Sequence, residues 1–461
     1  MQSEPEELVE LVRAHLAAAD LAALSAYLNS LHPADVAEAI ARLEPEERQQ
    51  IFQLLDIHHE ADVMEYAADG LRSDIVAALD DRRVSELVEE MHPEEAADLL
   101  AEMPEERADH VLELMTRDEA QEVEGLLRYP PDTAGGIMAP AVVRVRDDVS
   151  VRDVLAHIRS NDAMHEEDIY NIYVVDEADR VVGAVPLWAL LRSPPEAPVR
   201  EIMEPVQTVP AEMDQEEVAA LFGKYDLAAA PVVDRAGRLL GRITFDSIQD
   251  VVEEELSEDV SKFAGTDDDE LESPSAIRTA RLRLPWLLVC LGGTFVSGSV
   301  ISHFGGTLKA HIMLMVFVPA VMATAGNSGL QTATVTVRSL ATGYVDRVGG
   351  LPVVLKQIKA SVLVALACGL VAGVVGAAWS HWSPDPSTAG RGAMLGLIVG
   401  GAMFAAICLS CTLGVCVPLT FRKVGIDPAV ASGPLITTST DIFSLMVYLG
   451  VATALLVEVV Q

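Results

Sequence analysis

The sequence is poor in cysteine, and this shortage excludes some chemistry. It has five cysteines in 461 residues, and all of them lie in the apolar C-terminal part of the chain. A thiol in such surroundings behaves as a small hydrophobic side chain, so no disulfide framework is expected. Cys408 and Cys411 form a CxxC, but no histidine or acid lies near them in the sequence, which argues against a zinc or redox site.

Basic residues are scarce as well, and the shortage lies in the first part of the chain. Before Pro285 there are 24 Lys or Arg against 65 Asp or Glu, and from Pro285 onward eight against five. So acidic a part argues against nucleic acid or anionic lipid as its partner, and hydrated metal cations are its natural counter-ions. The plain alternative is an acidic surface that only confers solubility. The opening residues, MQSEPEELVELV, have acids in place of a basic signal-peptide start, so no cleaved signal is expected.

Charge is nearly absent from the last apolar run. Asp441 is the only charged residue between Asp427 and Glu458, in a stretch long enough to cross a bilayer. A carboxylate at that depth costs a few kcal/mol, so such acids usually face a water-filled path, a counter-charge or a bundle interior. A cation pathway is therefore the first hypothesis. The alternative is a carboxylate that holds helices together by hydrogen bonds to threonines in the same segment, namely Thr437, Thr438 and Thr440.

The apolar part predicts five membrane spans. They run roughly over residues 285–304, 312–337, 351–379, 393–419 and 429–457. Most of the flanking Lys and Arg residues fall on one side of these spans. The positive-inside rule then places the acidic part in the cytoplasm and, with five spans, the C-terminus outside.

The second and fifth spans differ from the others in composition. Both mix Gly, Ala, Ser and Thr with a proline that we expect inside the segment, Pro319 in one and Pro434 in the other. This composition lets helices approach closely and frees carbonyl groups, which are good ligands for hard cations or for their water shells. Asn327 and Gln331 add amide oxygens one helical turn apart on the same face. Tight helix packing without conduction is the alternative interpretation.

An internal repeat occupies residues 129–254. IMAPAVVRVRDDVSVRDVLAHI and IYVVDEADRVVGAV recur as IMEPVQTVPAEMDQEEVAALF and APVVDRAGRLLGRI. The spacing is 65 residues from Ile137 to Ile202 and 58 from Asp176 to Asp234, so the first copy has a seven-residue insertion between its helix and its hairpin. Each VVD run followed by a polar turn and a second apolar run predicts a β-hairpin.

The repeat resembles a tandem pair of CBS modules, regulatory domains that often bind adenine nucleotides. Their nucleotide signature has a Ser or Thr followed by an acid or amide three residues later. Here Thr244 is followed by Ser247 at that spacing, and Pro186 takes the hydroxyl position in the first copy. This departure argues against nucleotide binding, although ATP stays a candidate ligand. Before the repeat, the segments LHPADVAEAI, LEPEERQQIF, MHPEEAADLL and MPEERADHVL each place proline and acids at a helix start, which predicts a helical solenoid.

Three motifs carry a more specific resemblance. LLRYPPDTAGGIM precedes the CBS pair, AGNSGLQTATVTVRSLATG lies in the second span and DPAVASGPLITTSTD opens the fifth. Together they resemble the MgtE family of magnesium channels. The resemblance implies a homodimeric, Mg2+-selective channel of the cell membrane, with a pore between the protomers that closes when cytosolic Mg2+ is high. It implies no enzymatic activity.

The resemblance also assigns roles to pore residues. Asp441 corresponds to the aspartate that holds hydrated Mg2+ in the dimer, and the carbonyl groups of Ala323 and Thr437 correspond to ligands of its water shell. We add Asn327, from its position in the second span, to the expected ion-binding set. Because Mg2+ dehydrates reluctantly, a site sized for its hydrate can discriminate against Ca2+.

The acidic segment DVVEEELSED, residues 250–259, follows the second CBS module. Like charges three and four apart on a helix repel, and divalent cations would relieve the repulsion. A solvated charged helix is the plain alternative. The resemblance makes this segment a plug helix and assigns regulatory Mg2+ to acids in four regions. They are Asp250, Glu255, Glu258 and Asp259 of the plug, Glu216 and Asp226 of the second CBS module, Asp427 beside the pore, and Glu94 and Asp98 in the N domain.

The expected fold is a multidomain membrane protein. It has an α-helical N-terminal solenoid (1–128), an α+β tandem CBS pair (129–203 and 204–248), a connecting plug helix and linker (249–284) and a five-helix transmembrane domain (285–461). Two alternatives to a Mg2+ channel stay open. One is the same architecture moving Co2+ or Mn2+. The other is a CBS-regulated anion channel or membrane enzyme, against which stand the negative pore charge and the lack of a catalytic residue paired with Asp441.

Overall fold

The structure is a computed structural model that describes residues 5–18, 20–160, 171–267, 270, 276–382, 392–431 and 433–460. The chain forms two compact units, Met1–Glu253 and Glu254–Gln461, called here the N-terminal and C-terminal units. The insertion expected in the first CBS copy falls in residues 161–170, outside the described residues, as does part of the expected linker at 268–269 and 271–275.

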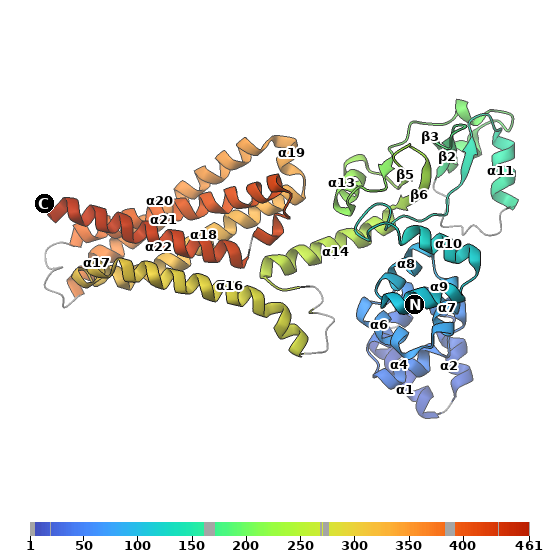
Figure 1. Cartoon of the computed structure of the whole chain (residues 1–461), viewed down its shortest axis with the longest axis horizontal. Helices are drawn as coiled ribbons and strands as arrows, with labels where there is room; N and C mark the ends of the chain where they lie inside the picture. The colour runs from blue at the N-terminus through green and yellow to red at the C-terminus, as the bar shows by residue number, and fades with distance from the viewer. Residues whose placement is uncertain are drawn as a thin grey trace. The chain divides into compact units, whose positions relative to one another are not determined.

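Ten helices form the first half of the N-terminal unit (Figure 1). Proline is the first residue of four of them, where its missing N–H costs nothing and its fixed φ suits the helix, and Pro104 lies one residue before a fifth. The prolines therefore begin helices as the sequence predicts. The ten are α1 (Pro5–Ala18), α2 (Leu21–Leu28), α3 (Pro33–Ala41), α4 (Pro45–Phe52), α5 (Ile57–Glu65), α6 (Asp69–Ala78), α7 (Asp81–Glu90), α8 (Pro93–Ala101), α9 (Glu105–Leu114) and α10 (Arg117–Leu126).

These short helices pack in a stacked order. Helices α1, α3, α5, α7 and α9 each contact the next one in that series, and α8 contacts α10. Contacts between next-but-one helices are typical of a helical solenoid. The core between them is apolar and fully buried, with Leu24, Phe52, Met64 and Leu99 among its large side chains.

The second half of the N-terminal unit contains the expected repeat. Two three-stranded sheets have the same order and the same parallel-then-antiparallel pairing, β1-β2-β3 and β4-β5-β6. The elements are β1 (Arg144–Arg146), α11 (Val151–Ser160), β2 (Asn171–Val175), β3 (Val181–Pro186), α12 (Leu187–Arg192), β4 (Val209–Pro210), α13 (Gln215–Tyr225), β5 (Ala229–Val233) and β6 (Leu239–Thr244), with a 3-10 turn at Val199–Glu201.

The two predicted hairpins have equivalent hydrogen bonds in their turns. Asp176 Oδ1 accepts from the backbone N–H groups of Ala178 (2.8 Å) and Arg180 (3.0 Å). In the second copy, Asp234 Oδ1 accepts from those of Ala236 (2.8 Å) and Arg238 (2.9 Å). Each aspartate thus fixes a tight turn through its own side chain.

The C-terminal unit is helical, and Figure 1 shows α18, α20, α21 and α22 running alongside one another. Helix α14 (Phe245–Ala264) enters this unit at Glu254. The other elements are α16 (Ala276–His303), α17 (Gly305–Ala310), α18 (Met313–Ala341), α19 (Tyr344–Val348), α20 (Gly350–Trp382), α21 (Gly392–Val424), a 3-10 turn at Ala429–Ala431 and α22 (Pro434–Val460).

Four described helices are long and apolar enough to cross a membrane: Ala276–His303, Gly350–Trp379, Gly392–Val424 and Pro434–Leu456. Helix α18, over the second predicted span, is not among them. Its 29 residues would extend about 43 Å, enough for a bilayer, and it mixes Asn, Gln, Ser and Thr with apolar side chains. A total of five spans, with residues 312–337 as the second, therefore stays a prediction.

One expectation about the prolines is wrong. Pro434 does not lie inside the fifth span but is the first residue of α22, because the preceding residues 429–431 form a separate 3-10 turn. Proline is favourable at the first helical position and frees no carbonyl there. Pro319 does lie inside α18, as predicted, where it cannot donate to the carbonyl four residues earlier.

Candidate functional site

Asp441 lies in the second turn of α22, and its side chain is half-buried against α18. The residue opposite it is Gly326: a Cβ atom built on this glycine would lie 3.1 Å from Asp441 Oδ1. Any larger residue would press on the carboxylate, so the glycine leaves room for it beside α18. The only acid of the last span therefore lies where the two Gly- and Thr-rich helices meet.

Threonine hydroxyls near Asp441 bond to backbone rather than to its carboxylate. Thr440 Oγ1 donates to the Thr437 carbonyl (3.0 Å), and Thr437 Oγ1 lies within 3.2 Å of the carbonyls of Gly433 and Pro434. Within the described part of the chain, no donor reaches the carboxylate of Asp441. The alternative of a carboxylate bonded to threonines as packing glue thus finds no support in this structure.

The predicted pore residues of the second span lie on an exposed face of α18. Ala323, Asn327 and Gln331 are four residues apart and exposed in the single chain, and the stripe continues through Thr334 to Arg338. The opposite face of α18 is buried against α21 and α22. Among the described residues, no hydrogen bond joins Asn327 to Asp441. The Thr437 carbonyl already accepts the Thr440 hydroxyl, and Ala323 lies within a regular helix.

Two glycines not expected to have a role, Gly329 and Gly414, allow α18 and α21 to pack closely. A Cβ on Gly329 would lie 2.7 Å from Ser410 Oγ, and one on Gly414 would lie 2.4 Å from the carbonyl oxygen of Gly329. Ser410 Oγ donates to the carbonyl of Ala325 (2.6 Å) and links α21 to α18. The glycines of AGNSGLQ were a visible signal, but which helix each one faces depends on the tertiary structure.

The end of α14 contacts the start of α22 within the C-terminal unit. A Cβ on Gly433 would lie 2.0 Å from the carbonyl oxygen of Phe263, and one on Gly265 would lie 2.5 Å from Pro434 Cγ. Gly265 also has a positive φ of +75°, which ends the helix. Only residues without a side chain allow the two helix ends to approach so closely.

Several of the expected regulatory acids gather at the same place. Lys262 Nζ lies 2.5 Å from Glu258 Oε1 and 2.9 Å from Asp427 Oδ2. Burial, followed by repulsion from Asp427 and Glu255, raises the pKa of Asp259 to about 6. The structure therefore brings four predicted acids, Glu255, Glu258, Asp259 and Asp427, into one electrostatic group at the end of α14.

The remaining predicted acids lie elsewhere. Glu216 lies in the first turn of α13, and Asp226 follows its last residue in a left-handed conformation, so the helix separates them by about 15 Å. Asp250 lies on α14 inside the N-terminal unit, where burial and then Asp246 raise its pKa. Glu216 and Asp226 are therefore not ligands of one ion within a single chain.

In the helical solenoid, Glu94 and Asp98 lie one turn apart on α8. Burial raises the pKa of Glu94, and burial together with the charge of Asp98 raises the pKa of the neighbouring Glu95 to about 7. Arg72 pairs with Glu95 at 3.6 Å and so partly offsets this acidic group. Among the described residues, no three His, Cys, Asp or Glu side chains are arranged to hold a metal ion.

The expected nucleotide positions are also visible. Thr244, the last residue of β6, is buried, and its hydroxyl lies 3.2 Å from the hydroxyl of Ser247. Pro186 ends β3 at the corresponding place in the first module and has no hydroxyl to offer. The two modules therefore differ at the position where the signature requires a hydroxyl.

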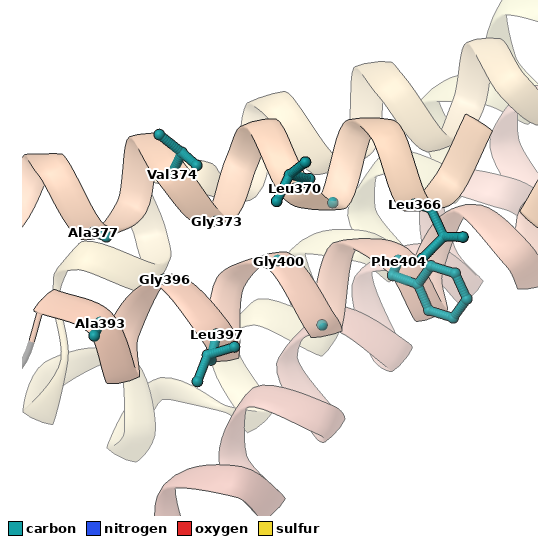
Figure 2. A pocket seen from close by; sticks show the side chains of 12 residues that line it. Leu366, Leu370, Gly373, Val374, Ala377, Ala393, Gly396, Leu397, Gly400 and Phe404 are labelled. Atoms are coloured by element: carbon teal, nitrogen blue, oxygen red, sulfur yellow. The ribbon is translucent and has the colours of Figure 1, made fainter. Parts of the chain in front are cut away.

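A cavity of about 450 Å³ lies between α20 and α21 (Figure 2). Glycines on both helices line it, and Figure 2 shows Leu366, Leu370, Leu397 and Phe404 around them. A Cβ on Gly400 would lie 2.5 Å from the carbonyl oxygen of Gly369, which shows how closely the helices cross. The lining has no charged or amide side chain, so the cavity offers no ligand to a metal ion.

Comparison with known proteins agrees with these elements. Three family models match: "Divalent cation transporter" over residues 318–451, "MgtE intracellular N domain" over 31–132, and "CBS domain" over 134–196 and 199–254. The magnesium transporter MgtE of Thermus thermophilus is 38% identical over 341 residues, which cover 73% of this chain and 72% of that protein. MgtE of Bacillus subtilis is 34% identical over 73% of this chain and 72% of its own.

A solved structure is similar as well. The crystal structure of the cytosolic domain of the Mg2+ channel MgtE in complex with ATP is 35% identical, has a TM-score of 0.50, and covers 53% of this chain and 99% of that one. Both MgtE relatives, which match over most of the chain, are transporters and not enzymes. By its matching N domain, CBS pair and transporter region, the chain belongs to the MgtE family of magnesium transporters.

Proposed function

We propose that this protein is a Mg2+-selective channel of the cell membrane whose opening is controlled by cytosolic Mg2+. The observation that carries the proposal is the position of Asp441, an intramembrane acid without a hydrogen-bond donor in the described chain, held beside Gly326 of a helix with a polar face. An unpaired carboxylate in a bilayer needs water or a cation. Mg2+, which keeps several waters when it binds, supplies both.

The pore forms between two copies of the chain. The exposed face of α18 carries Asn327, Gln331 and Thr334, which would be costly against lipid. A second copy related by a two-fold axis would place two such faces and two Asp441 carboxylates around one path. In this arrangement the acids attract the hydrated ion, and the carbonyl oxygens of Ala323 and Thr437 together with the Asn327 amide accept hydrogen bonds from its waters.

The acids of the N-terminal unit and of α14 make the channel close when cytosolic Mg2+ is high. The N-terminal unit and α14 lie in the cytoplasm, and the C-terminus lies outside the cell. At low cytosolic Mg2+ the carboxylates repel one another. Mg2+ bound among them favours the compact arrangement, in which α14 acts as a plug over the start of α22. The contact of Phe263 with Gly433 supports this role, because it links the end of α14 to the helix that carries Asp441.

The regulatory ligands in this proposal are acids of four regions. Mg2+ has a strong preference for carboxylate and water oxygens, and these side chains offer carboxylates on both the N-terminal unit and α14. The set comprises Glu94 and Asp98, Glu216 and Asp226, Asp250, Glu255, Glu258 and Asp259, and Asp427. The bilayer and a second copy are the other expected partners.

ATP is a further expected ligand of the CBS pair, because the similar cytosolic domain was solved with it. Thr244 is the one hydroxyl at a signature position, so we expect a single nucleotide site in the second module. Calorimetric titration of ATP into the purified protein and into Thr244→Ala tests this. Equal binding by both would contradict it.

The function itself is tested by ion flux. Purified protein in liposomes should transport Mg2+ and exclude Ca2+, because the smaller ion holds its hydration shell in better order. Co2+ and Mn2+ are included as competitors. Transport of Mn2+ or Co2+ in preference to Mg2+ would show that the channel is selective for another divalent ion. The absence of any cation flux would refute the proposal that the protein is a channel.

A further inference from the structure

The basic side chain at the end of α14 lies among the acids expected to bind regulatory Mg2+. Lys262 follows Glu258 by four residues on the helix, the better order for a Glu–Lys pair. Its Nζ also donates to Asp427 Oδ2 at 2.9 Å, across 165 residues of sequence. One ammonium group therefore bridges two carboxylates that the proposed function assigns to Mg2+.

Asp427 is held in place for this contact. It lies in the turn between α21 and α22, just after Gly425, whose φ is +78°. Its Oδ1 accepts from the backbone N–H of Ala429 at 2.7 Å, which leaves Oδ2 for Lys262. The backbone thus holds one oxygen of the carboxylate independently of the lysine.

Water and ions can reach the bridge. The side chains of Lys262, Glu258 and Asp427 are 31%, 46% and 38% exposed. Ion pairs with this exposure are weak, because water screens them and solvates the separated charges. The ammonium group can therefore leave the carboxylates when a stronger cation arrives.

We propose that Lys262 is a tethered cation that competes with Mg2+ for Glu258 and Asp427 and thereby raises the Mg2+ concentration at which the protein closes. The inference rests on the proposed function, since it concerns the regulation of the same acidic group. Mg2+ carries two charges and needs the same oxygen atoms, so the two cations exclude each other. With Lys262 absent, the two carboxylates have no ion-pair partner among the described residues and bind Mg2+ more tightly.

A different role for the same contact predicts the opposite sign. If Lys262 acted only as a clamp that holds the end of α14 to the turn before α22, its removal would loosen the closed arrangement. More Mg2+ would then be needed to restore it. The direction of the change in Mg2+ affinity therefore separates a competitor from a clamp.

The experiment uses the full-length protein purified in detergent and the variant Lys262→Gln. Mg2+ binding is measured by calorimetry, and closure by protection of α14 from protease as Mg2+ is added. We expect half-maximal protection at a roughly fivefold lower Mg2+ concentration in the variant, the size expected for a partly exposed ion pair. Lys262→Arg should behave as wild type because it keeps the charge. Lys356→Gln, which removes the same charge from an exposed position on α20, should leave the concentration unchanged.

The two ways of failing are distinguishable. A wild-type protein that shows neither Mg2+ binding nor protection would refute the proposed regulation itself. A wild-type protein that responds to Mg2+ while Lys262→Gln responds at the same or a higher concentration would overturn only the role of Lys262. In an Asp427→Asn background the effect of Lys262→Gln should shrink, since the shared carboxylate is gone. An undiminished effect there would place the competition elsewhere.

Discussion

Two regions of this protein use carboxylates in opposite ways. In the C-terminal bundle a single acid, Asp441, stands in a packed helix with a glycine opposite it and without a described donor. At α14 and in the solenoid, many acids lie on partly exposed helices and share arginine or lysine partners, as Glu95 does with Arg72 and Asp427 with Lys262. One isolated charge suits a path for an ion, whereas many coupled and partly compensated charges suit a sensor whose occupancy changes with ion concentration.

The largest expected effect comes from the isolated acid. Asp441→Asn removes the charge and keeps the volume, so it should abolish Mg2+ flux in liposomes while the protein still folds, since losing an intramembrane acid eases the folding cost. Size-exclusion elution like that of the wild type is the check on folding. Wild-type flux from a well-folded variant would defeat the assignment of Asp441 to the pore.

The next largest effect is expected where the end of α14 contacts the start of α22. Gly433→Ala places a methyl group 2.0 Å from the backbone oxygen of Phe263, so the end of α14 must move. Overpacking of this kind costs about 1–3 kcal/mol. Hydrogen exchange over residues 254–265 should therefore become faster. Gly450→Ala, within α22, would place its methyl group more than 4 Å from any neighbouring side chain and serves as the control. Equal exchange in both variants would show that the contact does not hold α14.

Substitutions in the turns of the two CBS modules should have a smaller effect. Asp179 and Gly237 occupy the same turn position in the two copies, with φ of +58° and +80°. A non-glycine residue is strained there, so Asp179→Gly should stabilise the first module by about 0.5–1 kcal/mol and Gly237→Ala should destabilise the second by a similar amount. Urea unfolding of residues 1–253 measures both, since the cytosolic part of a relative has been solved alone. If neither substitution changed the free energy of unfolding, this account of the turn would be contradicted.

The smallest expected effect depends on pH. Hydrogen bonds from the backbone of Arg180 to Asp176, and of Arg238 to Asp234, are the main cause that lowers the pKa of each aspartate. A lowered pKa means that the turn gains stability above the ordinary value near 3.8 and loses it as the pH falls through the folded value. The protection of the Arg180 and Arg238 amides, measured relative to their intrinsic exchange rates at each pH, should thus fall in acid, and Asp176→Asn should remove this dependence at Arg180. Glu177→Gln, a highly exposed neighbour, is the control.

How much the sequence could predict also differs between the regions. The helix starts at proline and the hairpins around VVD are local patterns, and the structure has both as expected. The isolation of Asp441 is also visible in the sequence, whereas its role in a pore stays a prediction. The position of Gly326 opposite Asp441 and the bridge from Lys262 to Asp427 depend on which helices pack together, so no single segment reveals them. Pro434 was misplaced because a Gly-Pro pair is compatible both with a kink and with a helix start, and only the turn at 429–431 decides between them.

The central claim is that Asp441 lies on the path of the transported Mg2+, whereas the acids of α14 bind the Mg2+ that closes the channel. One flux experiment tests this claim directly. Mg2+ flux through liposome-reconstituted protein is measured while Mg2+ on the side of the acidic unit is raised, for wild type, Asp441→Asn and a variant with Asp250, Glu255, Glu258 and Asp259 neutralised together. The account predicts wild-type flux that falls cooperatively, no flux at any concentration for Asp441→Asn, and flux that persists at millimolar Mg2+ for the neutralised variant. A neutralised variant that closes like the wild type, or an Asp441→Asn protein that conducts and still closes, would contradict it.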